Sequence, residues 1–222
     1  MSVDAGARYR GLLHDIDAEL LACGRPSGSV TILGVSKKQT REAVAAAIAA
    51  GLTDVGENYV QEAQMKFALL PPVRKHFIGR LQTNKAKAIA TLFDVVQSVD
   101  RPEAAHALDK AARAAGKALP VLLQLNVSPV DRFGCPPAQA DALAEAIRAL
   151  PGLRLEGIMA IGPVTPDRDE ISRAFHLAAK TLGRIGGTTL SIGMSDDWRE
   201  AVRAGSTMVR MGTALFGGRK NP

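Results

Sequence analysis

Residues 31–40 read TILGVSKKQT, and this stretch decides the fold. Its apolar first half predicts a buried strand over residues 31–36, and a helical stretch begins directly afterwards at Arg41. A strand followed at once by a helix is the unit of parallel β/α proteins. Such folds place their reactive groups at the carboxyl ends of strands, which is where Lys37 lies. Taken by itself, however, the stretch also fits a pair of solvated loop lysines, Lys37 and Lys38.

The same strand-then-helix unit repeats along the rest of the chain. The pattern predicts strands over residues 31–36, 54–57, 76–79, 94–99, 120–126, 153–161, 188–193 and 207–212. Eight strands close a parallel barrel, whereas a doubly wound open sheet usually has about five to seven. We therefore predict a single (β/α)8 TIM-type barrel. An open sheet remains the alternative that periodicity alone allows.

Apolar residues at helical spacing over 7–22 predict an additional N-terminal helix before the barrel. We assign residues 1–27 to this helix and its connector, 28–218 to the barrel and 219–222 to a tail, all in one domain. Asp100 and Glu103 form a capping-box pattern, with Pro102 in the same turn and Gly116 as the stop of that helix. A further helix is predicted over 137–150, before a Pro-Gly pair.

Composition excludes several classes of protein. The net charge of +6 is scattered along 222 residues, and six Phe, two Tyr and one Trp offer few platforms for stacking on bases, so we expect no nucleic-acid partner. No apolar run approaches the ~18 residues of a membrane span, and charges interrupt the N-terminal stretch, so we expect neither membrane contact nor a signal peptide.

The two cysteines, Cys23 and Cys135, lie far apart and have neither disulfide nor zinc spacing. They indicate a reducing compartment, and we expect a cytoplasmic protein. The four histidines also lack partner spacing. We expect no metal site.

The carboxyl ends of the predicted strands should meet at one mouth of the barrel. They bring Lys37, Asn58, Met159 and Arg210 to this face. An amine there, partly removed from water, can form a Schiff base with an aldehyde. On an extended strand end neighbouring residues point to opposite sides, so only one of Lys37 and Lys38 can face the mouth, and we assign Lys37.

The ends of the last two strands resemble a phosphate cradle. Ser195 is placed to cap the helix that carries Trp198, and a helix N-terminus favours an anion. Gly212 and Thr213 add unobstructed N–H groups and a hydroxyl. Phosphate sites recur after strands seven and eight of barrels. A cap and a turn glycine are common features singly, so the combination with Lys37 carries the hypothesis.

Seven blocks of this sequence together resemble the pyridoxal phosphate homeostasis proteins, over residues 8–218. The blocks are GVSK (34–37), VGENYVQE (55–62), HFIG (76–79), LQTNK (81–85), GIMAI (157–161), SIGMSDD (191–197) and GSTMVRMGT (205–213). The resemblance implies a barrel like the N-terminal domain of alanine racemase, which holds pyridoxal 5′-phosphate (PLP) as an internal aldimine.

Residue by residue, the resemblance assigns Lys37 as the aldimine lysine and Arg210 as the arginine that faces the pyridine nitrogen. Ser195, Gly212 and Thr213 match the phosphate-binding positions. Asn58 and Met159, in two further blocks, complete the expected cofactor-binding set.

The chain departs from the family pattern at a few positions. Arg80 stands where relatives often carry histidine or proline, Arg132 replaces a usual lysine, and the stretch before Thr188 is short. These departures put a second, lysine-dependent binding role in doubt, but not the cofactor site.

Three functions follow from these residues. The favoured one is a non-catalytic PLP carrier or regulator, a monomer with PLP-dependent apo-enzymes as partners. The alternative is a PLP-dependent amino-acid racemase, which needs a second acid/base opposite Lys37, and Tyr59 is the one plausible candidate. A cofactor-free, aldolase-like enzyme for sugar phosphates would explain the lysine and the cradle, but not the match across all blocks.

Overall fold

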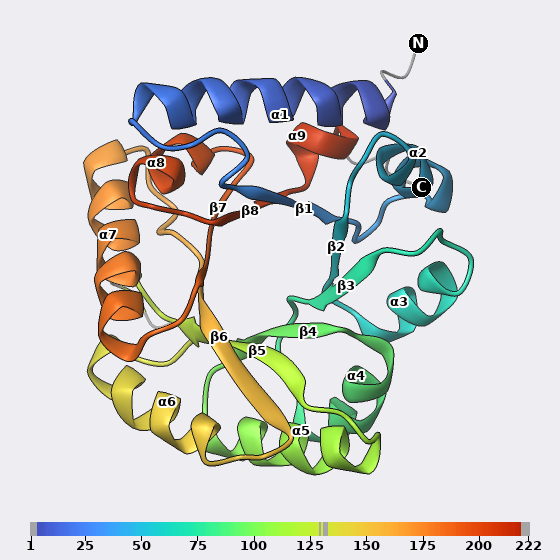
Figure 1. The fold of residues 1–222 in the computed structure, drawn as a ribbon, viewed down its shortest axis with the longest axis vertical. Helices are drawn as coiled ribbons and strands as arrows, with labels where there is room; N and C mark the ends of the chain where they lie inside the picture. Colours follow the sequence, from blue (N-terminus) through green and yellow to red (C-terminus); the bar gives the residue numbers. More distant parts are fainter. Residues whose placement is uncertain (1–3, 129, 131–132, 219–222) are drawn as a thin grey trace.

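The computed structural model describes residues 4–128, 130 and 133–218. Its centre is a closed barrel of eight parallel strands in sequence order, with helices around the outside (Figure 1). The strands are β1 Thr31–Val35, β2 Asp54–Glu57, β3 Arg74–Phe77, β4 Val95–Val99, β5 Leu119–Leu125, β6 Leu153–Ala160, β7 Thr189–Met194 and β8 Met208–Met211. This confirms the predicted (β/α)8 barrel and excludes the open sheet.

Closure of the barrel comes from the pairing of its first and last strands. β1 and β8 run parallel, with Leu33 opposite Arg210 and Gly34 opposite Met211. The strand that precedes Lys37 therefore lies directly beside the strand that carries Arg210. Six of the seven predicted site residues follow or belong to β1, β2, β7 and β8, and Met159 belongs to β6.

The helices alternate with the strands and cover the barrel. They are α1 Ala5–Ala22, α2 Arg41–Ala49, α3 Val60–Phe67, α4 Ala86–Leu92, α5 Pro102–Ala114, α6 Ala140–Arg148, α7 Arg168–Ile185, α8 Trp198–Arg203 and α9 Thr213–Phe216, with short 3-10 turns at Thr83–Lys85 and Pro137–Gln139. None of these helices combines the length and apolar composition needed to cross a bilayer.

The additional helix α1 lies across the outside of the barrel, alongside α9 and in contact with α2 and α8 (Figure 1). The Asp4 side chain caps it by accepting a hydrogen bond from the Gly6 N–H. Its residues Tyr9, Ile16 and Leu20 recur on one face and are buried. The predicted N-terminal helix is confirmed and begins two residues earlier than expected.

Two details of the prediction were wrong. The third strand runs over Arg74–Phe77 instead of 76–79, because Arg74 and Lys75 carry no apolar signal, although the Arg74 N–H pairs with the Thr53 carbonyl. The capping box is absent as well. Arg101 is the N-cap of α5 and makes no side-chain cap bond, while Pro102 in the first turn was predicted correctly.

Candidate active site

Lys37 lies in a tight turn that directly follows β1. The Gln39 N–H donates to the Ser36 carbonyl at 3.0 Å, which closes a four-residue β-turn with Lys37 and Lys38 at its centre. Lys38 has φ of 58°, a left-handed conformation that side chains other than glycine rarely adopt. The argument that an extended strand end separates the two lysines was therefore wrong. Lys37 is half-buried and Lys38 is exposed, which favours Lys37 for a different reason.

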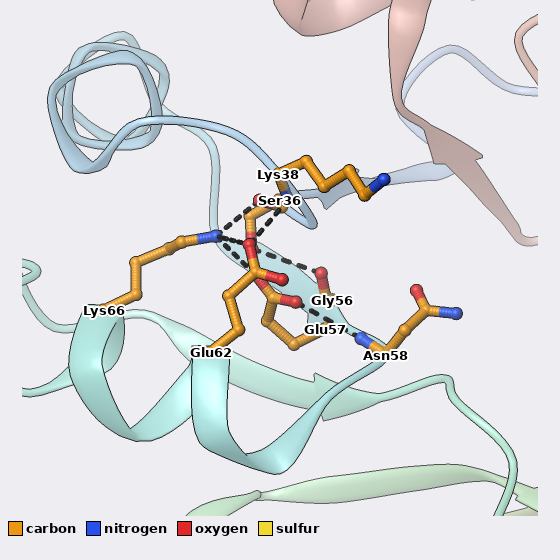
Figure 2. A network of polar contacts seen from close by, with 7 residues as sticks. All are labelled: Ser36, Lys38, Gly56, Glu57, Asn58, Glu62 and Lys66. Carbon is orange, nitrogen blue, oxygen red and sulfur yellow. Dashed lines mark hydrogen bonds and ion pairs between the residues drawn. The ribbon is translucent and has the colours of Figure 1, made fainter. Parts of the chain in front are cut away.

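A buried lysine supports this turn from below (Figure 2). The Lys66 Nζ, on α3, lies 2.5 Å from the Ser36 carbonyl, 2.5 Å from Glu57 Oε1 and 3.0 Å from Glu62 Oε1. The same Glu62 oxygen accepts the Lys38 N–H at 2.6 Å. The residues on both sides of Lys37 are therefore tied to one cluster of charged side chains.

This cluster is removed from water on its inner side. Glu57 is fully buried and the Lys66 side chain is 7% exposed. Burial raises the pKa of the Glu57 carboxyl, and the hydrogen bonds from Lys66 and Ser36 act against that rise. The sequence analysis assigned no role to Lys66, and it contained Glu57 only within the block 55–62. The four-residue spacing of Glu62 and Lys66 on one helix face was the available signal.

Arg210 on β8 is the second buried cation of the site. Its Nη1 donates to the Ser191 carbonyl at 2.6 Å and to Ser191 Oγ at 3.0 Å, and its Nη2 donates to the Ala160 carbonyl at 2.8 Å. Burial lowers the pKa of the guanidinium to about 10, and the nearby Asp197 carboxylate opposes this shift. Arg210 therefore stays protonated at neutral pH and is held in one orientation by β6 and β7.

From Ser191, which accepts from Arg210, a chain of hydrogen bonds continues through the barrel interior to Asp54. Ser191 Oγ donates to Gln97 Oε1 at 2.7 Å, Gln97 Nε2 lies 2.9 Å from His76 Nδ1, and His76 Nε2 lies 2.7 Å from Asp54 Oδ1. Sequence reasoning found no partner for His76, because its partners lie 21 and 22 residues away and meet it only when the barrel closes.

The three predicted phosphate-binding residues meet between β7 and β8. Ser195 Oγ accepts the Ala214 N–H at 3.1 Å, so it joins the loop after β7 to the first turn of α9. Its predicted role as the cap of α8 was wrong, because Asp197 is the last residue before that helix. Gly212 precedes α9, and a Cβ placed there would meet nothing closer than the Val35 Cβ at 3.9 Å. The space above Gly212 is therefore open.

A cavity of about 680 Å³ opens at the same end of the barrel, lined by Asn58, Arg80 and Phe133 among others. The Arg80 guanidinium lies 3.9 Å from the centroid of the Phe133 ring. Gly79 allows the ends of β2 and β3 to meet here, since a Cβ at that position would lie 2.1 Å from the Asn58 carbonyl oxygen. Arg132, the other predicted departure, lies outside the described residues.

Met159 faces the barrel interior. It is buried and lies opposite Ser191 of β7 and Gln124 of β5, and paired residues of parallel strands share a face. Met159 thus belongs to the same side of the sheet as Arg210.

The predicted site residues lie at separate strand ends. No hydrogen bond among the described residues joins Lys37 or Asn58 to the group of Ser195, Gly212 and Thr213. Over the described ranges, no three His, Cys, Asp or Glu side chains gather as metal ligands.

Comparison with known proteins places this geometry in a family. Residues 25–220 match the model of the alanine racemase N-terminal domain. The pyridoxal phosphate homeostasis protein of Pseudomonas aeruginosa is 47% identical over 203 residues, which cover 89% of this chain and 88% of the relative. That of Escherichia coli K12 is 40% identical over 218 residues, covering 92% of each chain.

Solved structures agree. PipY of Synechococcus elongatus, determined with PLP bound, is 34% identical and superposes with a TM-score of 0.79, covering 91% of this chain and all of PipY. Alanine racemase of Clostridium difficile, at 14% identity and a TM-score of 0.72, matches over 94% of this chain but 57% of its own length, and so shares the fold. This chain belongs to the family of pyridoxal phosphate homeostasis proteins, built on the barrel of the alanine racemase N-terminal domain.

Proposed function

We propose that this protein holds pyridoxal 5′-phosphate through a Schiff base to Lys37 and so takes part in intracellular PLP homeostasis, without appreciable turnover. In this proposal it acts as a monomer of one domain and supplies PLP-dependent apo-enzymes. The family relationship supports the proposal, as does the PLP-bound structure of PipY at 34% identity. Two free cysteines, Cys23 and Cys135, agree with a cytoplasmic location.

The observation that carries the proposal is an unsatisfied polar atom at the barrel mouth. The Asn58 Oδ1 is buried and has no hydrogen-bond partner among the described residues, while its side chain lines the cavity. A buried amide oxygen without a partner is unfavourable unless a ligand supplies a donor. A ligand bound in this cavity, beside Lys37 on the neighbouring strand end, would be placed to supply that donor.

The remaining residues fit the other parts of the same molecule. Ser195, Gly212 and Thr213 would bind its phosphate group with hydroxyl and N–H donors. Arg210 would face the ring nitrogen. PLP would supply an aldehyde, and the Lys37 amine would hold it as a Schiff base, with a C=N bond formed and one water released.

Arg210 also supports a role without turnover. An arginine with a pKa of about 10 donates hydrogen bonds at neutral pH and does not hand over its proton. The ring nitrogen that accepts from it stays neutral, so the ring withdraws few electrons from a bound amino acid. In addition, none of the described residues that line the cavity is a tyrosine. Tyr59, the candidate second acid/base of a racemase, begins α3 and is 57% exposed.

Borohydride reduction of the protein loaded with PLP, followed by peptide mass mapping, tests the proposal. The reduced adduct should lie on Lys37. A Lys37→Ala protein should lose the Schiff-base absorbance and should still show the far-UV circular dichroism of the wild type. The proposal fails if the wild-type protein carries no lysine adduct, or if Lys37→Ala keeps the absorbance.

A further inference from the structure

We propose that the charged cluster of Glu57, Glu62 and Lys66, here called the turn clamp, selects Lys37 over Lys38 as the amine that reacts with PLP. These are positioning residues and do not themselves touch the cofactor. The inference rests on the proposed function, because it concerns which of two adjacent lysines forms the Schiff base. Figure 2 shows the clamp beneath the turn.

The first step is that two adjacent lysines compete at this site. Lys37 and Lys38 are the two central residues of one β-turn, and both carry a primary amine on a flexible four-carbon stem. A small rotation of such a turn would exchange which side chain faces the barrel mouth. Selection of one lysine therefore depends on what fixes the backbone of the turn.

The second step is that the turn has an unfavourable backbone conformation of its own. Lys38 has φ of 58°, and in the part of the chain that the structure describes it is the one residue other than glycine with positive φ. A side chain that bears a Cβ disfavours this region, so the surroundings must hold it there. The 2.6 Å hydrogen bond from the Lys38 N–H to Glu62 Oε1 does so directly.

The third step is that the clamp holds both flanks of Lys37 at once. Before it, the Ser36 carbonyl accepts from Lys66 Nζ and the Ser36 hydroxyl donates to Glu57 Oε1 at 2.7 Å. After it, Glu62 accepts the Lys38 N–H. Lys66 Nζ lies 3.0 Å from the same Glu62 oxygen, so one ammonium group connects the two flanks.

The fourth step removes Lys66 itself as a candidate for the Schiff base. An ammonium group has three N–H donors, and the three acceptors Ser36, Glu57 and Glu62 take all of them. The Lys66 side chain is 7% exposed and its ion pair with Glu57 is buried. Because this amine is buried and each of its N–H groups is engaged, Lys66 acts on the turn and leaves the reaction to a neighbour.

Three variants test the clamp, each loaded with PLP, reduced with borohydride and mapped by mass spectrometry. Glu62→Ala removes the acceptor of the Lys38 N–H. Glu62→Gln keeps an acceptor oxygen at that place and serves as the conservative rescue. Glu42→Ala removes an exposed carboxylate of α2, paired with Arg41 alone among the described residues, and is the matched control.

We expect the ratio of adduct on Lys38 to adduct on Lys37 to rise about tenfold or more in Glu62→Ala, the change that follows from losing a hydrogen bond to a charged group. Glu42→Ala should keep the wild-type ratio, and Glu62→Gln, which keeps a neutral acceptor and loses the ion pair with Lys66, should lie between the wild type and Glu62→Ala. A wild-type ratio in Glu62→Ala overturns the clamp and leaves the proposed function standing. Absence of a lysine adduct in the wild-type protein overturns the proposed function first.

Hydrogen exchange of the wild-type protein without PLP gives a second test that needs no variant. The Lys38 amide should be protected from exchange, because it donates a hydrogen bond to Glu62. Without the clamp the same amide would face solvent and exchange freely. Exchange of the Lys38 amide at the rate of an unstructured peptide would contradict the clamp even if Glu62→Ala failed to fold.

Discussion

Arg210 and Asp54 lie at opposite ends of one continuous chain of hydrogen bonds that crosses the barrel interior. Between them stand Ser191, Gln97 and His76, with donor–acceptor distances from 2.7 to 3.0 Å. Arginine only donates hydrogen bonds, so Ser191 Oγ accepts one from Arg210 and its own O–H donates to Gln97 Oε1. The Gln97 amide then donates to His76 Nδ1, which leaves the His76 proton on Nε2, facing the Asp54 carboxylate. Every donor in the chain points the same way.

Gln97→Leu should destabilise the protein, because the change leaves the Ser191 O–H without its acceptor and His76 Nδ1 without its donor, both of them buried. Two such losses amount to about 2–4 kcal/mol in the free energy of unfolding. Urea unfolding followed by circular dichroism measures this. The neighbouring Ser98 offers a control, since its hydroxyl is buried and has no partner among the described residues. Ser98→Ala should stay within about 0.5 kcal/mol of the wild type. Equal effects of the two changes would contradict the chain.

The loss of stability at acidic pH should depend on the Asp54 carboxyl. Burial by itself raises the pKa of the Asp54 carboxyl, but the hydrogen bonds from His76 and Thr53 outweigh burial, and the net pKa lies below its ordinary value. A carboxyl whose pKa is depressed in the folded state stabilises the protein above its unfolded pKa of about 3.9 and loses this contribution as pH falls through the folded value.

The wild type should therefore lose more stability between pH 5 and pH 3 than Asp54→Asn, as measured by the urea midpoint at each pH. At pH 5 and above, Asp54→Asn should be the less stable of the two. If the urea midpoint of Asp54→Asn fell as much as that of the wild type between pH 5 and pH 3, another carboxyl would be responsible for the loss of stability in acid.

Ser195→Ala and Thr213→Val should each weaken PLP retention without unfolding the protein. In the proposed site each would remove one hydrogen bond to a charged phosphate oxygen, about 1.5–3 kcal/mol, and should raise the dissociation constant by roughly tenfold or more. Thr213 is exposed, so its replacement should leave the unfolding midpoint unchanged. Spectrophotometric titration with PLP gives the constants. Dissociation constants equal to that of the wild type would argue against the cradle.

The loaded protein should exchange the α-protons of amino acids slowly. In the proposed site Arg210 would leave the ring nitrogen neutral, and no tyrosine is among the described residues that line the cavity. The measurement is the rate of α-proton exchange, followed by NMR while the loaded protein is incubated in deuterated water with alanine, serine or glutamate. Exchange on the order of 1 per second or faster would favour the racemase instead.

The sequence alone predicted the barrel, because most strands carry their own local signal of apolar residues bounded by turns; the third strand, whose Arg74 and Lys75 carry none, was misplaced by two residues. It also located Lys37 and Arg210, since each follows or belongs to such a strand. It could not predict the partners of His76, nor the contacts that Lys66 makes with Ser36 and Glu57. Those contacts join residues from different strands and helices, and they exist only once the barrel has closed. The misplaced cap at Ser195 has the same origin, because its true partner is Ala214 in another helix.

The pairing of β1 with β8 bears on synthesis of the chain. Lys37 follows the first strand, whereas Arg210 and Thr213 belong to the last strand and the helix after it. A chain still emerging from the ribosome lacks the strand beside β1, and so has neither a closed barrel nor a complete binding site. In the proposed function PLP would therefore bind the closed barrel and could not guide the folding of the growing chain. A ligand that would bind only the closed barrel would add to the stability of the finished protein by mass action.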